Sequence, residues 1–152
     1  MDYQYMNQEK CFKFTLDELI DRLSVAQIKE MLLLNGGGQK EYIAKLEKDI
    51  DKILSEKEIP PSGNLFKYVA LIAIANMTVW RNKDDMGKLN NHSSDYLILL
   101  EFAQEVNSIK NIAKNRILAE TEELNQATAR STFFRKSDKN KWYSSLLKKL
   151  KE

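Results

Sequence analysis

The fold is decided by residues 15–32, TLDELIDRLSVAQIKEML. Thr15 and Glu18 form a T-x-x-E capping box, in which each side chain can satisfy an orphan backbone N–H at the start of a helix. Apolar residues then recur at helical spacing: Leu16, Leu19, Ile20, Leu23, Ile28, Met31 and Leu32. Asn35 and Gly36 follow, and this pair is suited to a left-handed cap. The stretch therefore predicts an amphipathic helix with one face in the core.

A second helix is expected after the three glycines at 36–38. Its apolar positions have 3-4-3 spacing opposite a heavily charged face: Ile43, Leu46, Ile50 and Ile53. Two prolines at 60–61 close it. A third helix is expected over about residues 64–86. It is apolar on almost every side between Leu65 and Val79, which predicts the central, most buried element.

The fourth expected helix begins near Ser94 or Asp95, either of which can cap it, and runs unbroken to about Ala129. The positions along its seam alternate at 3-4 spacing, which favours near-antiparallel packing or a coiled coil: Tyr96, Leu99, Ala103, Val106, Lys110, Ala113, Ile117, Glu120, Leu124 and Ala127. Such a helix would be about 50 Å long and would extend beyond the others. Its distal half therefore needs a partner, and we predict a homo-oligomer.

The fold class that follows is all-α, a bundle of four main helices with a basic amphipathic C-terminal helix. Only 5 glycines and 2 prolines interrupt the chain, and no alternating strand segments are present. We divide the chain into a helical domain over residues 1–129 and a basic, aromatic tail over residues 130–152.

The tail has eight basic and two acidic residues, a net charge of +6, whereas residues 1–129 carry 16 basic and 20 acidic residues, a net charge of −4. Four apolar residues of the tail share one helical face: Trp142, Leu146, Leu147 and Leu150. Such a segment could dock on an acidic groove of a protein partner, lie on an anionic membrane surface or contact phosphates. It could equally pack against the acidic body of the same or a neighbouring chain. The whole-chain charge of +2 argues against a dedicated nucleic-acid-binding protein.

Composition excludes several classes of protein. The chain has 152 residues, 43% apolar and 30% charged, which is the balance of an ordinary soluble domain. A single cysteine, Cys11, and a single histidine, His92, exclude an internal disulfide framework and a multi-histidine metal centre. The first ten residues have no apolar h-region, so no signal peptide is expected, and the longest apolar-rich run, residues 68–80, is shorter than the roughly 20 residues that span a bilayer. A cytoplasmic protein without a transmembrane segment is expected.

Polar side chains at helical spacing make up the candidate site. Three of them share one face of the third helix: Asn76, Trp80 and Asp84. Lys110 lies on the apolar seam of the fourth helix, with Asn107 close by. Because an unpaired ammonium is costly to bury, a buried Lys110 predicts an acidic partner. The candidates are Asp21, Asp84 and Asp85.

Two interpretations of this set stay open. One is a structural network of ion pairs and amides that fixes the register of the helices. The other is a pocket for an anionic small ligand of nucleotide or nucleotide-sugar type, in which Trp80 stacks on a base or sugar. The binding residues would be Asp21, Arg22, Asn76, Trp80, Asp84, Asn107 and Lys110. We favour a non-enzymatic module, without a cofactor, that binds such a ligand or a protein partner.

The alternative function is a Mg²⁺-dependent, all-α phosphohydrolase of nucleotides or nucleotide sugars, which would use carboxylates. Glu18 and Asp21 share one helical face, and Asp84 and Asp85 add two carboxylates from another helix. Four converging carboxylates could hold Mg²⁺ against a phosphate, as in all-helical nucleoside triphosphate pyrophosphatases. Against this, Glu18 already has a role as a cap, and the third helix has no second E-x-x-[DE] pair.

Three segments together resemble a family of small helical proteins: FTLDELIDRLSVAQIK (14–29), AIANMTVWRNKDDM (73–86) and EFAQEVNSIKNIAKNRI (101–117). The first helix of that family reads roughly GELIDKLTILEIK. Its second block pairs an Asn with a Trp and an acidic pair, and its third reads roughly Asn-x-x-basic-x-x-x-Lys-x-x-Ile. The matching positions here are Glu18, Leu19, Ile20, Asp21, Arg22, Leu23, Ser24, Ile28, Lys29, Asn76, Trp80, Asp84, Asp85, Asn107, Lys110, Lys114 and Ile117.

Members of this family occur in bacteria and phages, often beside glycosyltransferase genes for surface polysaccharides, and have no established activity. The resemblance therefore implies a small helical protein and no particular reaction. Residues 36–38 and 130–152 depart from the family pattern, so a function located there would be particular to this chain.

Overall fold

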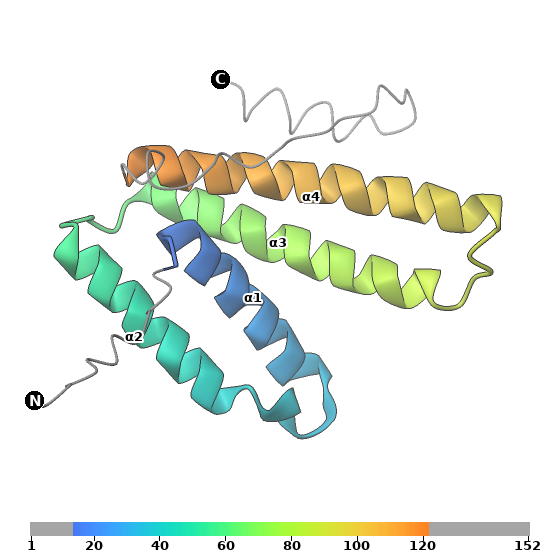
Figure 1. Cartoon of the computed structure of the whole chain (residues 1–152), viewed down its shortest axis with the longest axis horizontal. Helices are drawn as coiled ribbons and strands as arrows, with labels where there is room; N and C mark the ends of the chain where they lie inside the picture. The colour runs from blue at the N-terminus through green and yellow to red at the C-terminus, as the bar shows by residue number, and fades with distance from the viewer. Residues whose placement is uncertain (1–13, 122–152) are drawn as a thin grey trace, which may run out of the picture.

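The computed structural model describes residues 14–121, which fold into four α-helices without a strand (Figure 1). The helices are α1 (Leu16–Leu32), α2 (Lys40–Glu56), α3 (Gly63–Met86) and α4 (Ser94–Glu120), with a short 3-10 segment, η1 (Leu34–Gly38), after α1. The prediction of an all-α fold is confirmed. The tail, with its predicted basic helix, and the boundary at residues 129–130 lie outside the described residues. Over residues 14–121, no helix has both the length and the apolarity required to cross a lipid bilayer.

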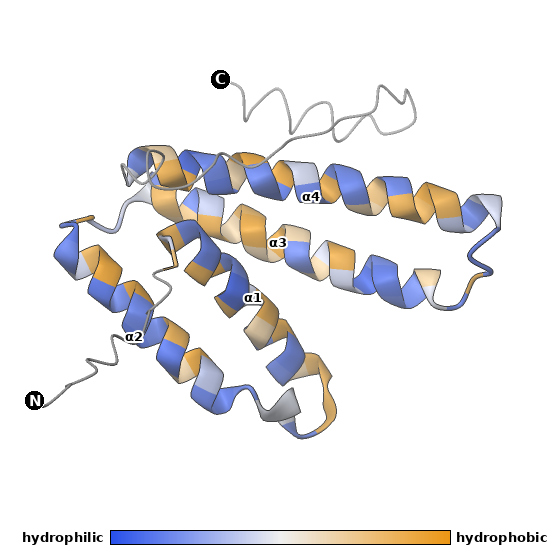
Figure 2. Ribbon diagram, in the orientation of Figure 1, coloured by the Kyte–Doolittle hydropathy of each residue, from blue (hydrophilic) through white to orange (hydrophobic). Residues whose placement is uncertain are grey.

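The helices form two hairpins, α1 with α2 and α3 with α4, and α1 contacts each of the other three helices. Figure 1 shows the α1–α2 hairpin lying against one half of α3, while the turn end of the α3–α4 hairpin extends beyond it. Fully buried Leu16 and Leu19 of α1 meet Ile72 of α3 and Ile117 of α4 in one core. On α2, the apolar residues lie on the side that faces α1 (Figure 2).

The start of α1 is the capping box that the sequence predicts. The backbone N–H of Thr15 donates to Oε2 of Glu18 at 3.4 Å, and the Thr15 hydroxyl donates to Oδ1 of Asp17 at 2.6 Å. The first contact satisfies a backbone N–H that the start of a helix otherwise leaves unpaired, and the second joins two side chains of the same turn.

The end of α1 differs from the prediction in its details. The left-handed conformation begins at Asn35 (φ 57°) as expected, but it continues through Gly38 (φ 67°). The helix itself ends earlier, with Leu33 as its extended C-cap. Successive positive φ angles are accessible here because three of the four residues are glycine. This turn reverses the chain and returns α2 along α1.

The prediction that α3 is the most buried element is wrong. Phe66 and Ile74 are 64% and 63% exposed, and Ala70 and Ala73 on the same side of the helix are also exposed. Helix α3 has more apolar surface than its neighbours cover, because α1 and α4 leave this side exposed. The central position belongs to α1.

The prediction for α4 needs two corrections. The helix ends at Glu120, with Thr121 as its C-cap, rather than running to Ala129, so its length is about 40 Å. Its N-cap is Ser93 rather than Ser94 or Asp95. The hydroxyl oxygen of Ser93 accepts from the backbone N–H of Tyr96 at 3.2 Å. Much of the predicted seam is buried: Ala103, Val106, Ala113 and Ile117.

Candidate functional site

A network of charged and amide groups lies where α1, α3 and α4 meet. Asn76 of α3 donates from Nδ2 to Oδ1 of Asp21 at 2.8 Å and to the hydroxyl of Ser24 at 2.5 Å. Lys110 of α4 donates to Oδ1 of Asn76 at 3.1 Å, and its Nζ lies 3.4 Å from Oδ1 of Asp21. The structure therefore brings together Asp21, Asn76 and Lys110, three residues that the sequence predicts to be neighbours.

A second buried pair completes the network. Nζ of Lys114 lies 2.6 Å from Oδ2 of Asp21 and 3.8 Å from Oδ2 of Asp17. The Asp17 side chain is 0% exposed and that of Lys114 is 7% exposed. Reasoning from charge burial alone missed both residues. The signal was the spacing: Asp17 and Asp21, like Lys110 and Lys114, are four residues apart and so share a helical face.

The network holds Asp21 in its ionised form. Burial raises the pKa of this carboxyl, but hydrogen bonds from Lys114 and Asn76 and the positive charges of Lys110 and Lys114 outweigh that effect. The pKa of Asp21 therefore lies below its ordinary value of 3.8. At neutral pH, Asp21 acts as a hydrogen-bond acceptor and a negative charge rather than as a proton donor.

The lowered pKa of Asp21 predicts a pH dependence of stability. The unfolded chain binds this proton at a higher pH than the folded chain, so the stabilisation is complete above about pH 4 and is lost as the pH falls toward the folded pKa. We expect the difference in free energy of unfolding between the wild type and Asp21→Asn to shrink as the pH falls below 4. Urea denaturation at a series of pH values measures this. A difference that stays constant with pH would contradict the assignment.

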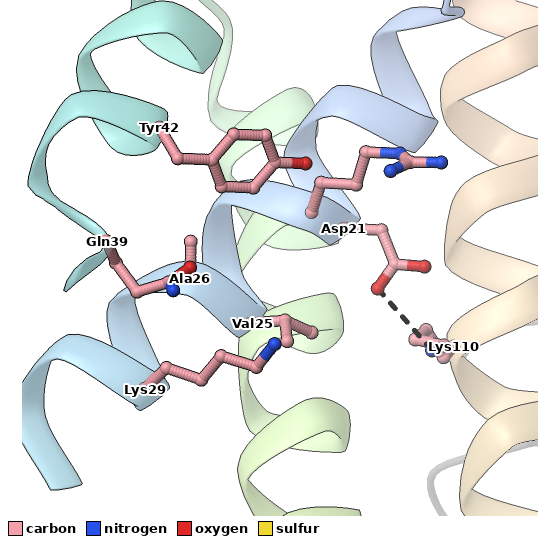
Figure 3. A pocket seen from close by; sticks show the side chains of 8 residues that line it. Asp21, Val25, Ala26, Lys29, Gln39, Tyr42 and Lys110 are labelled. Atoms are coloured by element: carbon pink, nitrogen blue, oxygen red, sulfur yellow. Dashed lines mark ion pairs between the residues drawn. The ribbon is translucent and has the colours of Figure 1, made fainter. Parts of the chain in front are cut away.

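A pocket of about 280 Å³ opens beside the network, between α1, the start of α2, and α4 (Figure 3). It is lined by Asp21, Arg22, Val25, Ala26, Lys29, Gln39, Tyr42 and Lys110. The five α1 residues lie on one face, since they follow one another at intervals of one, three, one and three. Figure 3 shows Tyr42 and Gln39 on the α2 side, Lys29 on α1 and Lys110 on α4.

The lining of this pocket is positively charged. It has three cations, Arg22, Lys29 and Lys110, and one carboxylate, Asp21, which forms ion pairs with both Lys110 and Lys114. The Arg22 guanidinium lies 4.1 Å from the centre of the Phe14 ring, and Lys29 has no ion-pair partner within residues 14–121.

The start of α2 adds to this positive potential. Gln39 is the N-cap of α2, and the N-terminal end of a helix has a partial positive charge. Together with the three cations, this arrangement favours an anion in the pocket.

The other predicted binding residues do not line this pocket. Asn76 is buried in the network, and Trp80 and Asn107 are half-buried. Asp84 is exposed, about 12 Å further along α3 than Asn76. Conversely, the prediction missed Lys29, Gln39 and Tyr42 as lining residues, because a polar face of a helix gives no sign of which neighbour it will meet.

The structure does not bring the four carboxylates of the magnesium alternative together. These are Glu18, Asp21, Asp84 and Asp85. Within the part of the chain that the structure describes, no group of three or more Asp, Glu, His or Cys side chains is placed to hold a metal ion. Glu18 caps α1, and Asp85 pairs with Lys88 at 3.0 Å.

The network and the pocket share Asp21 and Lys110, so the structural and the ligand-binding interpretations of the site meet at these two residues.

Comparison of the chain with protein-family models, with curated proteins and with solved structures finds no match.

Proposed function

We propose that this chain is a module that binds a small anionic ligand in the pocket between α1, α2 and α4. The observation that supports it is the set of three cations, Arg22, Lys29 and Lys110, around one space whose single carboxylate is already paired. Like charges that face a common space repel one another, and a bound anion relieves that repulsion.

The volume of the pocket narrows the class of ligand. Its 280 Å³ lies at the small end of the range of about 300–1,000 Å³ that is typical of ligand pockets. Within the nucleotide-type class expected from the sequence, this volume favours a sugar phosphate or a mononucleotide over a larger nucleotide sugar.

Tyr42 is better placed than Trp80 to contact the organic part of such a ligand. Its side chain lines the pocket and it is 39% exposed. Figure 3 shows its hydroxyl pointing from α2 toward α1, and this hydroxyl makes no hydrogen bond to any other residue of 14–121. The ring offers an apolar surface, and the hydroxyl offers both a donor and an acceptor.

Substituting Lys29 tests the proposal. We expect Lys29→Gln to weaken binding of adenosine monophosphate and of ribose 5-phosphate by about 10- to 100-fold, because a hydrogen bond to a charged group is worth about 1.5–3 kcal/mol. Isothermal titration calorimetry on the full chain measures the affinities.

The matched control is Lys45→Gln, which removes an exposed lysine of α2 outside the pocket and should leave the affinity unchanged. Thermal unfolding of both variants verifies that they are folded. Failure of the wild type to bind either compound at millimolar concentration would overturn the proposal, as would equal effects of the two substitutions.

The magnesium-dependent phosphohydrolase stays the alternative prediction, and the same compounds test it. Release of phosphate in the presence of Mg²⁺, lost in Asp21→Asn, would favour an enzyme over a binding module. Several other expectations from the sequence also stay predictions. They are self-association through α4, bundle packing, binding of a protein partner by the tail, a cytoplasmic location and membership of the family that the three segments resemble.

A further inference from the structure

The charges that line the pocket do not cancel. Arg22, Lys29 and Lys110 contribute three positive charges and Asp21 contributes one negative charge, so the formal charge of the lining is +2. The two remaining charges of the adjoining network, Asp17 and Lys114, are opposite in sign and add no net charge.

We infer that the pocket selects a dianionic terminal phosphate, the monoester of a small organic molecule, over monoanions such as carboxylates and phosphate diesters. This inference deepens the proposed function and rests on it. A ligand of charge −2 neutralises a lining of charge +2, whereas a monoanion leaves one positive charge uncompensated in a partly desolvated space. A phosphate monoester is largely dianionic at neutral pH, because its second pKa is about 6.

The arrangement of the cations fits the same group. Arg22 and Lys29 are seven residues apart on α1, about 10 Å along the helix axis, and both line the same wall of the pocket. Lys110 approaches from α4 on the other wall. Cationic donors from two walls suit a terminal phosphate, which presents three unesterified oxygens, better than a diester, which presents two.

The rest of the lining suits a small organic group. Val25 and Ala26 provide apolar surface on α1, and Tyr42 and Gln39 provide polar groups on the α2 side. A sugar ring has both apolar C–H surface and hydroxyl groups, so this lining accommodates a sugar bearing the terminal phosphate.

The titration of the ligand provides the test. The charged or titratable side chains around the pocket are Asp17, Asp21, Arg22 and Lys29 on α1, Tyr42 on α2, and Lys110 and Lys114 on α4. The second pKa of a phosphate monoester is about 6, so between pH 5 and pH 7.5 such a ligand changes from mostly monoanionic to mostly dianionic.

We expect ribose 5-phosphate to bind the full chain about tenfold more weakly at pH 5 than at pH 7.5, since the dianionic fraction falls about tenfold over that range. Calorimetric titration measures both affinities. Glucuronate, a monoanion at both pH values, should bind more weakly than ribose 5-phosphate at pH 7.5. Inorganic sulfate, a dianion at both pH values, should bind without this pH dependence.

The outcomes separate the inference from the proposed function. If none of these anions binds at either pH, the proposed function fails. If glucuronate and ribose 5-phosphate bind equally at pH 7.5, the pocket binds anions but the preference for a dianion is overturned. Arg22→Gln and Lys29→Gln should each reduce the affinity ratio of the two sugars, whereas Lys45→Gln should not. Unchanged ratios in both pocket variants would also overturn the inference.

Discussion

Asp21→Ala is expected to reduce the free energy of unfolding by about 3–5 kcal/mol, because it removes one partner of a buried ion pair. Lys114, whose Nζ lies 2.6 Å from this carboxylate, would lose its closest counter-charge while 7% exposed. Asn76 and Lys110 would lose a shared acceptor in the same site. Chemical denaturation followed by circular dichroism measures the change.

Two further variants make this result interpretable. Asp84→Ala removes an exposed carboxylate of α3 and is expected to change stability by less than about 0.5 kcal/mol. Asp21→Asn retains an oxygen that can accept a hydrogen bond but lacks the charge, so it serves if Asp21→Ala does not fold. A loss below about 1 kcal/mol for Asp21→Ala would show that the ion pairs contribute no more than exposed ones.

Lys114→Met is expected to have an effect of similar size, again about 3–5 kcal/mol. It removes the ammonium group nearest to fully buried Asp17 and to Asp21. Methionine preserves much of the volume of the lysine stem, so the loss reports on charge more than on packing. Lys83→Met, at an exposed position of α3, is the matched control and should be nearly neutral.

Combining the two substitutions separates the ion pair from its surroundings. The double variant Asp21→Ala/Lys114→Met should lose clearly less free energy of unfolding than the sum of the two single losses. In the double variant both charges of the pair are removed, so neither is left without its partner. If the losses instead add to within about 0.5 kcal/mol, the two side chains are not energetically coupled, and the network would not be the unit described above.

Much of the secondary structure could be predicted from the sequence because it depends on neighbours within one or two turns. The capping box of Thr15 and Glu18 acts over three residues, and it marks the start of α1 correctly. The sequence also predicted that Lys110 meets a carboxylate, since a buried ammonium requires one, and of the three candidates the structure places Asp21 beside it.

Predictions that depended on the number of neighbours were less accurate. Hydropathy shows how apolar α3 is, but it does not show how many helices cover it, so the exposure of Phe66 and Ile74 was unforeseen. Periodicity likewise predicted that α4 continues past Thr121, because apolar residues at helical spacing can continue in a sequence beyond the C-cap of a helix.

The sequence by itself determined the all-α class, the approximate bounds of the helices and the pairing of Lys110 with a carboxylate, because hydrogen bonding, capping and charge burial act locally or admit few solutions. Only the tertiary structure decided that Tyr42 and Gln39 come to face Lys110 across a cationic pocket. The left-handed turn at residues 35–38 follows from its local glycines, but the juxtaposition also depends on how the two hairpins pack, which is set by many side chains at once.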